Sequence, residues 1–155
     1  MAHDDTAPRG NGGPPATSRS LPIALLRARE AVMGNFRPML ADFDVTEQQW
    51  RVMRVLSEAG RLDASDLAAR ASILAPSLTR ILKTLEDRAW VQRERDASDG
   101  RRSWLALTRS GHGLIAEVAP RSREIYDTIE RRFGAERVET LLDLLNELGD
   151  AMRRD

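Results

Sequence analysis

The hydrophobic pattern of this chain changes from a helical period to a strand period after Trp90, and this change constrains the fold most strongly. Between residues 46 and 88, apolar residues recur every three or four positions, as they do on the buried face of a helix. From Val91 the period is two residues, and Leu105 and Leu107 continue it. Residues 96–100 between these segments end in Asp-Gly, which favours a tight turn. Three short helices followed by a β-hairpin predict a winged helix-turn-helix.

Capping residues mark where the three helices begin. Thr46 and Gln49 have the spacing of a capping box, and the helix that they open ends near Gly60. Asp63 is a suitable N-cap for the second helix, and Pro76 suits the first turn of the third. On the first of these helices we expect the side chains of Trp50, Met53 and Leu56 to face inward.

Longer amphipathic helices are predicted at both ends of this core, over residues 21–41 and after residue 108. The last helix follows Gly134 and has a heptad-like pattern of apolar residues. Because these helices have more apolar surface than one small domain hides, we expect a dimer built from the chain ends. Its expected interface residues are Leu21, Leu25, Val138, Leu141, Leu145, Leu148 and Met152. The predicted fold is mainly α with a small β-hairpin wing, a winged helix-turn-helix with terminal dimerisation helices.

Composition excludes several classes of protein. Of 155 residues, 41% are hydrophobic and 31% charged, and no apolar run approaches the roughly 18 residues of a membrane helix. Residues 1–20 are rich in Gly, Pro, Ser and Asp, so we expect a disordered tail without a secretory signal and a cytoplasmic protein. There is no cysteine, and the two histidines lie far apart, so no metal site is expected. The acidic residues lack a histidine or cysteine partner, and we expect no catalytic residue, no cofactor and no enzymatic activity.

The charge is unevenly distributed, although 24 basic and 24 acidic residues give a net charge of zero. Residues 76–109 carry 8 basic and 5 acidic residues, so the third helix and the hairpin form a basic stretch. All basic residues except Lys83 are arginines, which suit bidentate contacts to phosphates and base edges. A GC-rich genome is the simpler explanation of the arginine content.

The helix that begins near Pro76 has the features of a DNA recognition helix. Small hydroxyl groups in its first turn allow the helix end to enter a major groove, and the helix dipole favours phosphate there. The residues off its apolar face are Ser77, Thr79, Arg80 and Lys83. The alternative is an ordinary solvent-exposed helix face. The hairpin favours DNA binding, because Arg101 or Arg102 can enter a narrow minor groove.

Over about residues 20–150, the sequence resembles MarR-type transcriptional regulators. The motifs that carry the resemblance are Leu78-Thr79-Arg80-Ile81-Leu82, Leu85-Glu86, Trp90-Val91, Arg93, Asp99-Gly100-Arg101, Leu107-Thr108 and Gly111. Residues 21–31 and 46–52 are similar to the regulators of homoprotocatechuate-degradation operons within that family. The resemblance implies a homodimer that binds a pseudo-palindromic operator in double-stranded DNA. It also implies release of the DNA by a small phenolic or aromatic carboxylate effector.

The resemblance also implies roles for individual residues. Arg101 matches a wing arginine that reaches the minor groove, and Asp99 matches the acid that steadies the wing. Arg80 either contacts DNA or braces the wing through Asp99. Ala89 is a departure, since many members have glycine there, and a left-handed backbone would strain alanine by roughly 1 kcal/mol. The expected DNA-contacting residues are Pro76, Ser77, Thr79, Arg80, Lys83, Arg95, Asp99, Arg101 and Arg102.

Four residues are predicted to bind the effector. Arg27 and Arg29 lie near the apolar face of the first helix, where an arginine can pair with an aromatic carboxylate. Phe36 and Trp50 can stack on the aromatic ring. The alternatives are that both aromatic residues belong to the core and that the arginines form surface ion pairs with Glu30.

The predicted function is a repressor of aromatic-acid catabolic genes, of the homoprotocatechuate or 4-hydroxyphenylacetate type, that a phenolic carboxylate releases from DNA. Activation in place of repression stays open. After the tail, residues 21–155 form one MarR-like unit, with a DNA-binding lobe at 44–108 and dimerisation helices at 21–43 and 109–155. The alternative from another class is a helical dimeric structural or protein-binding module whose winged lobe does not bind DNA. A steep salt dependence of DNA binding distinguishes the two.

Overall fold

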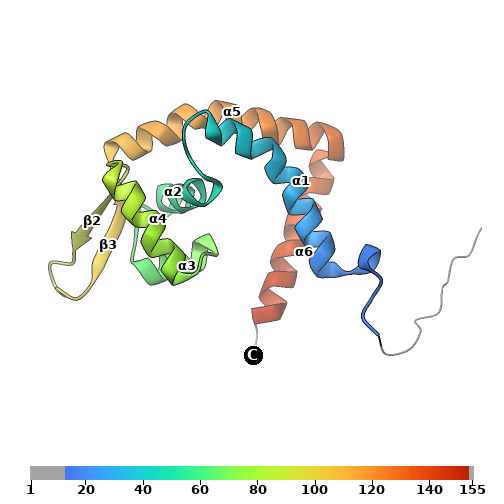
Figure 1. Ribbon diagram of the computed structural model, residues 1–155, viewed down its shortest axis with the longest axis horizontal. Helices are drawn as coiled ribbons and strands as arrows, with labels where there is room; N and C mark the ends of the chain where they lie inside the picture. Colours follow the sequence, from blue (N-terminus) through green and yellow to red (C-terminus); the bar gives the residue numbers. More distant parts are fainter. Residues whose placement is uncertain (1–12, 154–155) are drawn as a thin grey trace, which may run out of the picture. The chain divides into compact units, whose positions relative to one another are not determined.

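The computed structural model describes residues 13–153 and divides into two compact units, Met1–Gly34 and Asn35–Asp155 (Figure 1). The first unit contains a short 3-10 helix, η1 (Thr17–Arg19), and most of α1 (Leu21–Ala41), which continues into the second unit. None of the described residues of the first unit is buried, and Leu21 is 53% exposed. Of the tail that we predict to be disordered, residues 1–12 lie outside the described residues, and residues 17–19 form η1.

The second unit has an apolar core to which α2 (Glu47–Ala59), α3 (Ala64–Ala71) and α4 (Ala75–Asp87) each contribute one face. The largest fully buried side chains include those of Met53, Leu56, Leu67, Leu82, Leu85 and Leu105. Trp50, which we expected to face inward, is only half-buried. The inward face of α2 is instead formed by Val52 together with Met53 and Leu56. The expectation for Met53 and Leu56 is therefore confirmed, and the one for Trp50 is corrected.

The predicted capping residues are confirmed. The backbone N–H of Gln49 donates to Thr46 Oγ1, and the backbone N–H of Thr46 donates to Gln49 Oε1, both over 3.1 Å. Asp63 accepts the backbone N–H of Asp66 over 2.9 Å at the start of α3. Each cap satisfies a backbone amide that has no partner within its own helix, so these residues fix where the helices begin.

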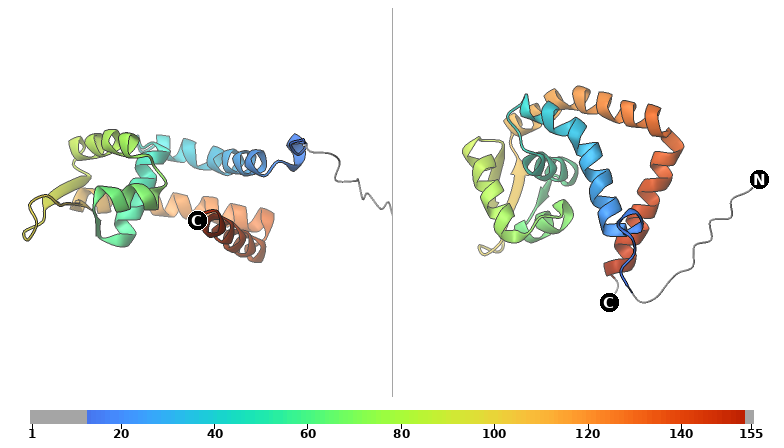
Figure 2. Two further views of the ribbon diagram at one scale, coloured as in Figure 1. Left: turned by 90° about the horizontal axis from the view of Figure 1, so that it is seen from below. Right: turned by 45° about the vertical axis from the view of Figure 1, so that its right-hand side comes forward.

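The hairpin that we predicted belongs to a three-stranded antiparallel sheet, in the order β1-β3-β2. β2 (Val91–Arg95) pairs with β3 (Ser103–Leu107), and Val91 lies opposite Leu107. The additional strand β1 (Arg61–Leu62) pairs with β3, and Leu62 lies opposite Leu105. A strand of two residues has no detectable alternation, which is why the sequence did not predict it. The hairpin, residues 91–107, extends beyond α3 and α4 (Figures 1 and 2) and is called the wing below.

Two long helices complete the second unit. α5 (Arg109–Phe133) begins at the end of β3 and continues through Pro120, and α6 (Ala135–Arg153) follows it after a sharp turn at Gly134 (Figure 2). No residue of α6 is buried, and its heptad-like positions include Leu141, which is 43% exposed, and Leu145, which is 38% exposed. Among the helices of residues 13–153, none is both long and apolar enough to cross a membrane.

Ala89, at the position where many MarR-type regulators have glycine, has a left-handed backbone with φ at 57°. Its carbonyl accepts the Thr108 hydroxyl over 2.6 Å, which ties this turn to the start of α5. Because a side chain in the left-handed region costs about 1 kcal/mol, we expect Ala89→Gly to raise the free energy of unfolding by up to about 1 kcal/mol. Urea denaturation measures this change. Ala69→Gly, inside α3, is the control and should lower the same quantity by about 1 kcal/mol. Equal losses from both substitutions would show that Ala89 is unstrained.

Candidate nucleic-acid interface

α3, residues 72–74 and α4 form a helix-turn-helix whose second helix has a polar face. The residues that pack α4 onto the core are Leu78, Ile81, Leu82 and Leu85. Pro76 lies in the first turn, where its missing amide hydrogen removes no helix bond. Of the five residues predicted to contact DNA on this helix, Ser77 is half-buried and the exposed ones are Pro76, Thr79, Arg80 and Lys83. The start of α4 therefore offers hydroxyl groups and cations on one side and is anchored by leucines on the other.

The two cations of α4 differ in their contacts. The guanidinium of Arg80 forms no hydrogen bond or ion pair with another residue in the described range 13–153. The bracing contact from Arg80 to Asp99 is therefore not formed in this structure. Lys83 Nζ lies 3.2 Å from Asp87 Oδ2, and the two side chains are 77% and 65% exposed. Such an exposed pair contributes little, so both cations are available for phosphate or base edges.

A cluster around Trp104 holds the end of the wing that carries the turn. Arg61 and Arg102 lie over its ring, each with the guanidinium carbon 4.8 Å from the ring centroid. The indole N–H donates to Asp96 Oδ2 over 2.9 Å, and the backbone N–H and hydroxyl of Ser98 donate to Asp96 Oδ1. These donors, first of all the Ser98 N–H, hold the pKa of Asp96 well below its usual range. The ionised Asp96 carboxylate thus fixes the turn of the wing to Trp104 on β3.

The two arginines of the wing tip differ in their contacts. Arg102 Nη2 lies 3.1 Å from Oδ2 of Asp63, the N-cap of α3, so Arg102 joins the wing to the helical core. The backbone N–H of Asp66 and then Arg102 lower the pKa of Asp63. Arg101 is exposed, and its guanidinium has no hydrogen bond or ion pair with any other described residue. Of the two, Arg101 is the one that is available to DNA.

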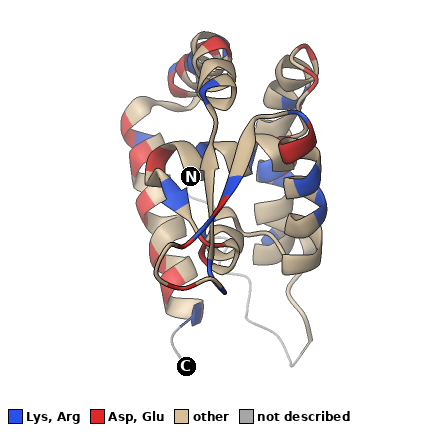
Figure 3. Cartoon of the chain, turned by 90° about the vertical axis from the view of Figure 1, so that its left-hand side faces the viewer, with Lys and Arg blue, Asp and Glu red and all other residues tan. Residues whose placement is uncertain are grey.

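The remaining wing residues support this arrangement. Asp99 Oδ1 accepts the backbone N–H of Arg101 over 3.0 Å, and the Asp99 carbonyl accepts the N–H of Arg102 over the same distance. Asp99 therefore shapes the turn that carries Arg101. Arg95 is exposed at the end of β2, and basic and acidic residues alternate along this strand (Figure 3).

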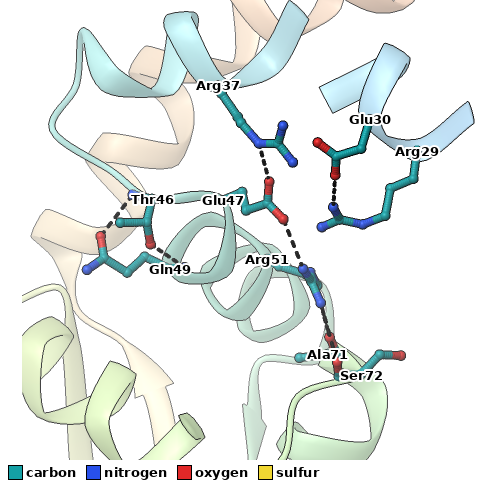
Figure 4. Close-up of polar contacts among 9 residues, drawn as sticks. All are labelled: Arg29, Glu30, Arg37, Thr46, Glu47, Gln49, Arg51, Ala71 and Ser72. Atoms are coloured by element: carbon teal, nitrogen blue, oxygen red, sulfur yellow. Dashed lines mark hydrogen bonds and ion pairs between the residues drawn. The ribbon is translucent and has the colours of Figure 1, made fainter. Parts of the chain in front are cut away.

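The four predicted effector-binding residues fall in both units. In the first unit, Arg27 is exposed, and Arg29 Nη1 lies 3.0 Å from Glu30 Oε1 (Figure 4). In the second unit, Phe36 is buried and packs edge-on against Tyr126, with the ring centroids 5.2 Å apart. Trp50 is half-buried. Phe36 thus has the core role that the alternative gave it, and Arg29 forms the expected surface pair.

Three residues with functional potential were not singled out from the sequence. Leu74, the N-cap of α4, is 79% exposed, and an apolar side chain at this place suits contact with a thymine methyl group. Tyr126 is 46% exposed while it contacts Phe36. Arg54 lies one turn after Trp50 on α2, so the two share a helix face. This spacing is visible in the sequence, whereas the exposure of Leu74 depends on the tertiary structure.

Comparisons with known proteins identify the helix-turn-helix and the wing as parts of a known family of regulators. The sequence model of the MarR family matches residues 45–103, which contain the helix-turn-helix and most of the wing. The HTH-type transcriptional regulator FarR of Neisseria gonorrhoeae is 47% identical over 129 residues, which cover 83% of this chain and 88% of FarR. The chain belongs to the MarR family.

Two further similar proteins match this chain over nearly their whole length. The homoprotocatechuate degradative operon repressor of Escherichia coli is 43% identical over 139 residues, 88% of this chain and 94% of that protein. The crystal structure of NadR in complex with 4-hydroxyphenylacetate is 44% identical, with a TM-score of 0.78, and covers 86% of this chain and 97% of NadR. The predicted fold and the predicted class of protein, a MarR-family transcriptional regulator, are confirmed.

Proposed function

We propose that this MarR-family regulator is a homodimeric repressor of aromatic-acid catabolic genes and leaves its operator when an aromatic carboxylate binds. The observation that carries the proposal is the similarity to the homoprotocatechuate degradative operon repressor and to NadR, whose structure holds 4-hydroxyphenylacetate. Residues 44–108 act as the DNA-binding lobe, and the helices in 21–43 and 109–155 form the dimer. The protein acts in the cytoplasm, where its DNA lies, and performs no catalytic step.

At the operator, the start of α4 enters the major groove and Arg101 enters the minor groove. The exposure of Arg101 and its place on a turn shaped by Asp99 support this assignment. We expect Arg101→Ala to weaken operator binding at least about tenfold, because a charge-assisted contact is lost in each half-site. Fluorescence anisotropy with a labelled operator measures the affinity. Arg132→Ala, at the end of α5, is the control and should bind as the wild type does. Wild-type affinity in Arg101→Ala at physiological salt would contradict the assignment.

The effector proposed here is an aromatic acetate such as 4-hydroxyphenylacetate. Its carboxylate needs a cationic partner, and its ring needs an apolar or aromatic wall such as Trp50. We expect added 4-hydroxyphenylacetate to weaken the operator complex, since a ligand that prefers one lobe spacing shifts the protein towards it. Arg29→Ala should abolish this response and leave the DNA affinity of the free protein unchanged.

Arg54→Ala is the matched comparison for the effector experiment, because Arg54 is the cation one turn from Trp50. If Arg54→Ala loses the response to 4-hydroxyphenylacetate and Arg29→Ala keeps it, the carboxylate binds at α2 and not at α1. If no phenylacetate, benzoate or cinnamate changes operator affinity, the effector proposal is wrong and the DNA-binding proposal is unaffected.

A further inference from the structure

A chain of polar contacts joins α1, α2 and the end of α3 (Figure 4). In the last part of α1, Arg37 Nε donates to Glu47 Oε2 over 2.8 Å. The other carboxylate oxygen, Oε1, lies 3.7 Å from Nη2 of Arg51, one turn later on α2. Arg51 Nη1 donates to the carbonyl of Ala71 over 3.0 Å and lies 3.4 Å from the carbonyl of Ser72. Polar contacts thus run from the end of α1, across α2, to the end of α3.

Glu47 is the centre of this chain. Its side chain is only 18% exposed, and each of its two oxygens contacts a different guanidinium. It lies in the first turn of α2, where the helix dipole favours a negative charge, and the capping box of Thr46 and Gln49 fixes that turn. Arg51 is itself 35% exposed. A partly buried carboxylate that is held on both sides restrains Arg51 more than an exposed pair does.

Arg51 acts on the helix end that leads into α4. The carbonyls of Ala71 and Ser72 lie at the C-terminus of α3, where backbone oxygens lack partners within the helix and a cation is favoured. Ser72 has φ 51° and ψ 51°, the left-handed conformation that ends α3. Because α4 begins at Ala75, the direction of α4 depends on this short turn. Nη1 of Arg51 contacts both carbonyls while Nη2 faces Glu47, and the guanidinium thus holds the turn in one geometry.

We propose that Arg51 is a positioning residue for the recognition helix. Held by Glu47, whose other oxygen Arg37 contacts, it fixes the turn at Ser72 and so sets the angle at which α4 meets the major groove. It acts through the protein backbone and makes no contact with DNA. The inference rests on the proposed function, because the angle of α4 matters only when α4 binds an operator.

The test is operator affinity measured at several salt concentrations. Arg51→Met keeps the apolar stem and removes the fork, and we expect an affinity about tenfold lower than that of the wild type. The slope of affinity against salt should stay unchanged, since no phosphate contact is lost, whereas loss of a phosphate-contacting residue reduces it by about 1. Arg123→Met on α5 removes an exposed pair with Asp127 (2.9 Å) and is the matched control, with wild-type affinity expected.

A second variant keeps the proposal testable if Arg51→Met does not fold. Glu47→Gln preserves the shape of the side chain but removes the charge that holds Arg51, and we expect about threefold weaker operator binding. The double variant should bind no more weakly than Arg51→Met alone, because both changes act through one contact. Arg51→Lys should restore affinity only in part, since an ammonium is a point charge and not a fork.

Three results would overturn the proposal: wild-type affinity in Arg51→Met and Glu47→Gln, a salt slope lowered by about 1, or fully additive losses in the double variant. Failure of the proposed function would give a different result from failure of the Arg51 proposal. In that case the wild-type protein does not bind an operator, and Arg101→Ala has no effect on DNA binding.

Discussion

Replacing Leu145 and Leu148 with glutamate should give an unfolded or aggregated protein. Leu145 is 38% exposed in the single chain, Leu148 is half-buried, and no residue of α6 is buried. In the proposed dimer each leucine contributes about 1.5–3 kcal/mol in each protomer, which is large beside a typical domain stability of about 5–15 kcal/mol. Glutamate removes that contribution and adds charges that an apolar interface cannot solvate. Sedimentation and circular dichroism measure the result.

The control for this experiment adds two glutamates to α6 at positions outside the heptad-like pattern. Thr140 and Asn146 are exposed and lie outside the heptad-like positions, so Thr140→Glu with Asn146→Glu should leave a folded dimer. A well-folded monomer from the double leucine variant would show that the second unit is stable without a partner. That outcome would contradict an obligate dimer through the terminal helices.

Gly111→Ala should destabilise the fold by about 3 kcal/mol. A Cβ at Gly111 would lie 2.2 Å from the carbonyl oxygen of Trp90 and 3.1 Å from its carbonyl carbon. The same oxygen accepts the backbone N–H of Thr108 over 3.0 Å. Relief of the clash therefore requires backbone movement where the recognition helix, the sheet and α5 meet. Urea denaturation measures the loss of free energy of unfolding.

Gly113→Ala is the matched control for Gly111→Ala. It lies on the same helix two residues later, and nothing is within 4 Å of the position that its Cβ would take. Alanine has the higher helix propensity, so this variant should gain up to about 1 kcal/mol. Equal stability changes at the two positions would contradict the close approach of Trp90 to α5.

The parts of the fold that local sequence determines were predicted well. Thr46, Asp63 and Thr108 begin helices because each side chain accepts a backbone N–H three residues later, a contact that depends only on spacing. β1 was missed because two residues have no period, and Trp50 was misplaced because Val52 fills the inward face of α2.

The candidate site was predicted less completely, because its contacts join residues that are distant in sequence. The residue pattern alone leaves Arg101 and Arg102 equivalent. The family resemblance singles out Arg101, and the ion pair between Arg102 and Asp63, 39 positions away, gives the physical difference between the two. The contact of Arg51 with the end of α3 spans 20 positions and has no local pattern. The polar face of α4 was predictable because it is the complement of an apolar helix period.

The most direct test of the proposed function is the affinity of the wild-type protein for its own upstream DNA and for a scrambled duplex, from low to physiological salt. We expect a pseudo-palindrome with half-sites about 10 bp apart to bind far more tightly than the scrambled duplex. The affinity should fall steeply with salt, and 4-hydroxyphenylacetate should lower it further. Equal, weak binding to both duplexes, without a steep salt dependence, would contradict operator recognition and favour a winged lobe that binds protein.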